Sequence, residues 1–85
     1  MKNEYDFGNG LVAAHQHSNG GGWVADTATV TDTAYVGRYA LVYGTAAVSG
    51  NAAVFGDAQV SGDAQVYGVA MVYGDALLTN GVRLV

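Results

Sequence analysis

The chain has 85 residues, enough for one domain, and a formal net charge of −4, with three strong bases against seven acids. So few bases argue against binding to nucleic acid or to anionic membrane surfaces. The absence of cysteine excludes disulfides and thiolate metal sites. The first ten residues lack the apolar core of a secretion signal, and no apolar run approaches the length of a membrane span.

Residues 1–23 precede a regular repeat and are predicted to form an N-terminal cap and connector. His15 and His17 form an H-x-H pair, which on a strand would place both rings on one side as a weak metal site, provided that an oligomer gathers further ligands. The alternative, a solvated pair in the cap, is favoured. The run Gly20–Gly22 lacks the Lys-Ser/Thr of a phosphate loop and is expected to be a flexible connector. Trp23 is expected to close the top of the repeat core.

A six-residue period begins at Val24 and runs over residues 24–83. Position one is Val in every repeat except at Leu78, and position five is Ala in every repeat except at Val82. Position three is Gly from Gly44 to Gly74, and position four is often Asp or Asn.

The Ala at position five and the next Val lie two residues apart, so on a strand both side chains point to the same side. The Gly-Asp or Gly-Asn pair then supplies a bend. The period therefore predicts short strands alternating with corners around a polygonal coil. A period of six does not keep one face on a helix, and collagen needs Gly at every third residue. A hairpin meander of very short strands is the weaker alternative.

The repeats VGRYAL and Val-x-Gly-Asp/Asn-Ala-x resemble the hexapeptide-repeat family, and are most similar to YdcK-type bacterial and phage β-solenoid repeats. The resemblance covers residues 24–85. It implies an all-β fold: a single-stranded, left-handed parallel β-helix with three repeats per coil and about three coils. Residues eighteen apart would then stack, which places Arg83 on Gln65 and Tyr73 on Phe55, and puts Asp57 and Asp75 in one column of corners.

Large apolar side chains recur at positions that should point outward, and a contiguous set of this kind marks an interface. We therefore predict a homo-oligomer, a trimer first and a dimer next. The expected interface residues are Tyr35, Leu41, Phe55, Tyr67, Met71, Tyr73, Leu77, Leu84 and Val85.

The family includes acyltransferases with a catalytic His and an extruded loop, but residues 24–83 contain neither a His nor an insertion. We therefore expect no enzyme activity and no cofactor, with a metal ion at His15 and His17 as the one exception. The favoured function is a structural or protein-interaction module. The resemblance implies a phage or mobile-element protein, such as a virion or tail accessory, located in the cytoplasm or on a virion. The alternative is a small inhibitor that docks on a host enzyme, and a degenerate hexapeptide acyltransferase is the least favoured interpretation.

Overall fold

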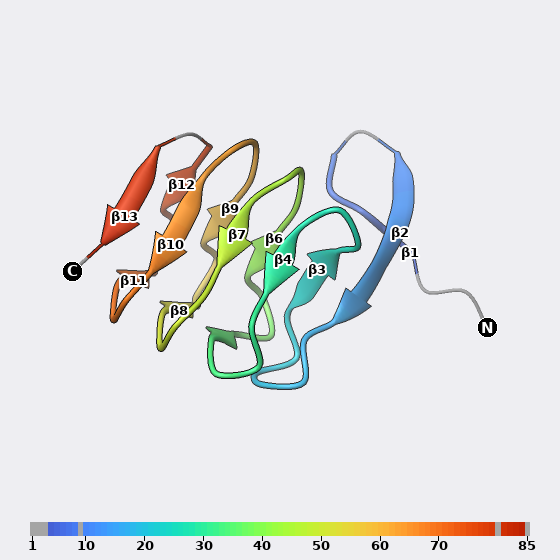
Figure 1. Ribbon diagram of the computed structural model, residues 1–85. Coiled ribbons are helices and arrows are strands. Elements are labelled where there is room, and N and C mark those ends of the chain that lie inside the picture. The colour runs from blue at the N-terminus through green and yellow to red at the C-terminus, as the bar shows by residue number, and fades with distance from the viewer. Residues whose placement is uncertain (1–3, 9, 80, 85) are drawn as a thin grey trace.

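The computed structural model describes residues 4–8, 10–79 and 81–84, the last three through their backbone. The described residues form strands and no helix, and from β3 onward the strands follow one another around stacked coils (Figure 1). The predicted all-β solenoid of about three coils is confirmed. The strands are β1 (Glu4–Asp6), β2 (Leu11–Gln16), β3 (Trp23–Ala25), β4 (Thr29–Val30), β5 (Tyr35–Val36), β6 (Leu41–Val42), β7 (Ala47–Val48), β8 (Ala53–Val54), β9 (Gln59–Val60), β10 (Gln65–Tyr67), β11 (Met71–Val72), β12 (Leu77–Leu78) and β13 (Val82–Leu84).

Three sheets make the three sides of the solenoid. Their strand orders are β1-β2-β3-β6-β9-β12, β13-β10-β7-β4 and β11-β8-β5. All pairs between coils are parallel, and the register of the first side joins Trp23 to Leu41, Leu41 to Gln59 and Gln59 to Leu77. Each step is eighteen residues, so the predicted stacking of three repeats per coil is confirmed on this side.

The core consists of two kinds of column. Of the nine valines from Val24 to Val72 that head the repeats, eight are inaccessible to solvent and Val30 is half-buried. The alanines at position five lie between them. Each buried Val contributes roughly 1.5 kcal/mol or more by removal of apolar surface from water. The period of six thus encodes a narrow core in which a medium and a small side chain alternate around every coil.

The glycines at position three form the corners, and two requirements select them. Gly44 has a φ of 69°, a left-handed conformation that disfavours other residues. A Cβ atom on Gly44 would also lie 2.7 Å from the amide nitrogen of Gly62, one coil further along. The corners are hydrogen bonded to each other, since Thr45 donates its N–H and its hydroxyl to the carbonyl of Gly62. A side chain at Gly44 would therefore push neighbouring coils apart.

The last repeat departs from the predicted register. In β13, Val82 pairs with Gln65 and Arg83 with Val66, a step of seventeen residues, so the expected stacking of Arg83 on Gln65 is wrong. The carbonyl of Gly81 accepts the N–H of Gln65, a role that Ala64 has for Ala47 one coil earlier. Gly81 is therefore the small residue that precedes β13. It stands one residue earlier in the chain than the period of six predicts.

The N-terminal residues cover two of the three sides at their end of the solenoid. β2 pairs antiparallel with β3 and β1 with β2, which extends the first side by a hairpin (Figure 1). On the third side, Val36 of β5 donates its N–H to the carbonyl of Asn19 and accepts the N–H of Gly22. The run Gly20–Gly22 is thus a hydrogen-bonded neighbour of β5. A Cβ on Gly20 would lie 2.1 Å from the carbonyl oxygen of Val36, and a Cβ on Gly22 would lie 2.2 Å from that of Gly37. These close approaches explain the glycines better than a flexible connector does.

Candidate functional site at the N-terminal end of the solenoid

Four aromatic rings form a continuous row across the hairpin and the first two coils, which we call the aromatic ladder. Trp23 stacks on Tyr5 at 5.1 Å between ring centroids, Tyr5 contacts Phe7 at 4.8 Å, and Phe7 stacks on Tyr43 at 4.8 Å. Trp23 is half-buried and occupies the outward column of Leu41, so the prediction that it closes the core is wrong. Stacked pairs of this kind contribute about 0.5–1.5 kcal/mol each beyond their burial, so the ladder fastens the hairpin to the coils.

The turn between β1 and β2 is held by Asp6. Its Oδ1 atom accepts the N–H groups of Gly8 at 2.7 Å and Gly10 at 3.1 Å. Both glycines have positive φ, which suits a tight turn. Because Phe7 lies inside this turn, the carboxylate of Asp6 also fixes the backbone that carries one ring of the ladder.

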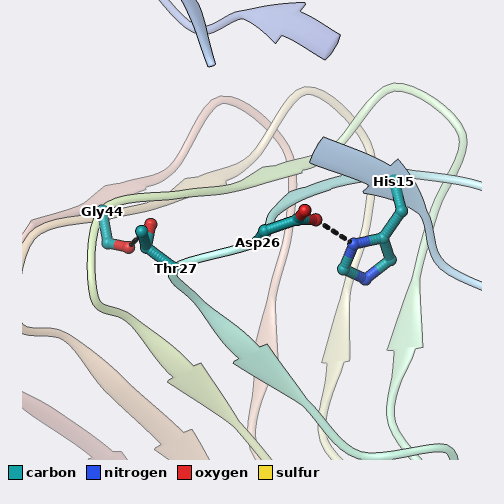
Figure 2. Close-up of polar contacts among 4 residues, drawn as sticks. All are labelled: His15, Asp26, Thr27 and Gly44. Atoms are coloured by element: carbon teal, nitrogen blue, oxygen red, sulfur yellow. Dashed lines mark hydrogen bonds and ion pairs between the residues drawn. The ribbon is translucent and has the colours of Figure 1, made fainter. Parts of the chain in front are cut away.

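Beside the ladder, His15 and Asp26 form an ion pair if the imidazole is protonated, with Nδ1 and Oδ1 separated by 2.8 Å (Figure 2). The side chains are about half exposed, at 48% and 56%, so the pair contributes at most about 1 kcal/mol to stability. The next residue, Thr27, donates its hydroxyl to the carbonyl of Gly44, as Figure 2 also shows. These bonds connect β2, the corner after β3 and the corner after β6.

His17 has a different environment. It is 5% exposed, and its Nε2 lies 2.8 Å from the carbonyl oxygen of Ala34, to which Asn19 also donates at 3.1 Å. This geometry requires His17 to carry a proton on Nε2. The side chain therefore fixes the 17–22 segment against the corner before β5.

The structure gives the two histidines of the H-x-H pair separate partners on separate segments: His15 bonds to Asp26 and His17 to Ala34. In the part of the chain that the structure describes, no three His, Asp or Glu side chains come together as a metal-binding group. A metal ion shared by His15 and His17 stays a prediction that would need a rearrangement of both contacts.

Two hollows flank the ladder. The first, which we call the ladder pocket, has a volume of about 280 Å³ and lies between the hairpin turn and the corners after β3 and β6. Phe7, Val12, Tyr43 and Asp26 are among its lining residues. The second, of about 390 Å³, is a more open depression whose lining includes Trp23 and Arg38 among other aromatic and polar residues.

The residues predicted as an interface fall into three groups. Tyr35, Met71, Tyr73 and Leu77 are exposed, at 40%, 50%, 56% and 61%. Leu41, Phe55 and Tyr67 are half-buried. The side chain of Leu84 and all of Val85 lie outside the described residues.

Other expected contacts between coils are found at the corners and on the third side. The predicted stacking of Tyr73 on Phe55 is confirmed, with centroids 5.4 Å apart and an interplanar angle of 11°. Asp57 donates its N–H to the carbonyl of Gly74, the corner arrangement expected for its column.

Sequence reasoning did not find the aromatic ladder or the pairing of His15 with Asp26. The available signal for the ladder was the spacing of Tyr5 and Phe7, because aromatic residues two apart share a side of an extended chain. Asp26 sits in a variable position of the first repeat, and only the hairpin brings His15 to it, so no periodicity could have shown this contact.

No protein-family model, curated protein or solved structure matches this chain. None of the described segments is a helix with the length and apolar character needed to cross a membrane.

Proposed function

We propose that this protein is a non-catalytic structural module that associates with copies of itself through its last coil. The observation that carries the proposal is a cluster of exposed apolar side chains within nine consecutive residues, which we call the last-coil patch. Its members are Val69 at 57% exposure, Met71 at 50%, Tyr73 at 56% and Leu77 at 61%. Exposed apolar side chains gathered in one coil in this way are typical of a protein–protein interface.

The backbone beside the patch supports the same assignment. β11 and β12 are the outermost strands of their sheets. An edge strand presents unpaired N–H and C=O groups that readily pair with another chain. A second copy is the partner that matches this surface most simply, because copies of the same surface can cover one another around a two-fold or a three-fold axis.

The preceding coil carries smaller or more polar side chains at three of the four equivalent positions, whereas Phe55 stands eighteen residues before Tyr73. Eighteen residues before Val69, Met71 and Leu77 stand Asn51, Ala53 and Gln59. The repeat therefore does not need large apolar groups at these outward positions, and their presence in the last coil calls for a cause other than folding.

The test of self-association uses the equivalent residues of the preceding coil. The triple variant V69N/M71A/L77Q replaces each patch residue by the one that the solenoid accepts one coil earlier, so the fold should be retained. We expect the native chain to sediment as a trimer or dimer at tens of micromolar and the variant to sediment as a monomer. A native chain that stays monomeric, or a variant with unchanged mass, would contradict the proposal.

Two single variants serve as controls and separate the geometries. Tyr39, 73% exposed and outside the patch, should be replaceable by Ser without a change in mass. Tyr35 shares its column with Met71 but lies in the first coil. If Y35A also weakens the oligomer, the whole side formed by β5, β8 and β11 is buried between copies, as around a three-fold axis. If Y35A has no effect, the copies meet end to end through their last coils.

The resemblance of the repeats supports a phage or mobile-element setting, with a virion or tail accessory as the proposed role. Enrichment in purified particles would agree with that role. Capture of one host enzyme by a monomeric chain would instead favour the inhibitor.

A further inference from the structure

We propose that the ladder pocket binds a small organic cation with an apolar body, such as an aryl-alkyl ammonium. The pocket is separate from the last-coil patch, because its residues come from the hairpin and from the corners after β3 and β6. Its volume of about 280 Å³ lies near the lower end of the range for small-molecule sites. A ligand with one ring and a short chain is therefore the right size.

The walls of the pocket are apolar. The stacked rings of Phe7 and Tyr43, inclined by only 19°, form one of them. Val12, which is 45% exposed, and the neighbouring Ala13 contribute aliphatic surface. Aromatic rings provide stacking surface for an aryl group and a negative face that attracts an ammonium ion.

The charge in the pocket selects a cation. Asp26 is the one charged side chain that lines it, and only its Oδ1 atom is bonded, to His15. Within the described residues no partner is found for Oδ2. This oxygen can accept a charge-assisted hydrogen bond from an ammonium group.

Three hydrogen-bond donors of the residues that line the pocket are already committed, which disfavours an anion. The N–H of Gly10 donates to Asp6 and the N–H of Asp26 to the carbonyl of Ala13. The hydroxyl of Thr27 donates to Gly44. The formal charge of −4 for the whole chain also raises the local concentration of cations over that of anions.

Three ligands of nearly equal shape test the proposal: 2-phenylethylammonium, 2-phenylethanol and phenylacetate. Each is titrated at neutral pH while the backbone amide resonances are followed by NMR. We expect the ammonium ligand to bind most tightly and to shift the amides of residues 26, 27 and 44. An alcohol or carboxylate that binds as well as the ammonium ligand, shifts confined to the last coil, or no shifts at millimolar ligand would overturn the proposal.

Two variants locate the interaction. Asp26→Asn keeps an acceptor for His15 but removes the charge, and should weaken binding of the ammonium ligand about three- to fivefold while leaving the alcohol unaffected. Tyr43→Ser introduces the residue found one coil later at Ser61 and should weaken both ligands. Tyr73→Phe, at the other end of the solenoid, is the matched control. Equal effects of Asp26→Asn on the charged and the neutral ligand would refute the role of the carboxylate.

Discussion

Two corner glycines with the same backbone conformation differ in what surrounds them, and this difference makes a quantitative prediction. Gly44 and Gly74 have φ values of 69° and 68°. A Cβ on Gly44 would lie 2.7 Å from the nitrogen of Gly62, whereas a Cβ on Gly74 would meet no atom within 4 Å. Substitution by Ala therefore imposes the same backbone strain at both positions and a steric clash at only one.

The magnitudes follow from these two terms. A left-handed Ala costs about 1–2 kcal/mol, and the reduced freedom of the unfolded chain offsets about 0.4–1 kcal/mol of that cost. Gly74→Ala should thus lower the free energy of unfolding by about 1 kcal/mol. Gly44→Ala should lower it by a further 1–3 kcal/mol, roughly, because the backbone of the next coil must move. In a chain of this size each kcal/mol shifts Tm by about 4–8 °C.

The assay is urea unfolding followed by circular dichroism, with both variants compared with the native chain. Local fraying of the last coil could lower the cost at Gly74 for an unrelated reason. Val54→Ala and Val72→Ala control for this, because both valines are buried in one column and each substitution should cost about 2 kcal/mol. If Val54→Ala and Val72→Ala lower the free energy of unfolding equally, and Gly44→Ala and Gly74→Ala also do so, the stacking of corners is refuted.

Three further substitutions test other contacts. Tyr5→Leu should remove the stacking on Trp23, change the tryptophan fluorescence and cost about 1 kcal/mol; an unchanged spectrum would contradict the ladder. His17→Phe should leave the carbonyl of Ala34 with fewer donors and lower the free energy of unfolding by about 1–3 kcal/mol in urea titration, whereas a neutral effect would contradict its bond. Ala58→Leu should overfill the core and lower Tm by an amount equivalent to about 1–3 kcal/mol; a stabilised variant would show that the column is not packed.

The architecture could be predicted from the sequence because each repeat encodes its own geometry. The columns of Val and Ala specify which side chains point inward, and their spacing specifies the stacking of Gln59 on Leu41 and of Leu77 on Gln59. The predicted register of β13 was wrong where the repeat pattern is weakest. Val82 is the one residue at position five that is not Ala, and Gly81 serves as the small residue before the strand instead. The left-handed twist of the coil stays a prediction from the resemblance.

The candidate site could not be predicted in the same way, because it is built by the segment without a repeat. The aromatic ladder needs the hairpin to fold back, and the bond between His15 and Asp26 joins residues eleven apart through that fold. The expected pairing of His15 with His17 assumed one continuous strand. β2 instead ends at Gln16, and the chain turns towards β5, which separates the two rings.

The central claim is that residues eighteen apart are neighbours on adjacent coils, and disulfide trapping tests it directly in a chain that has no cysteine. Ala47 and Gln65 are paired on β7 and β10, and adjacent strands lie about 4.8 Å apart, within reach of a disulfide. The variant A47C/Q65C should form an intramolecular disulfide under mild oxidation, while A47C/Q59C, on two different sides of the prism, should not. Efficient crosslinking of the second pair and not the first would contradict the solenoid.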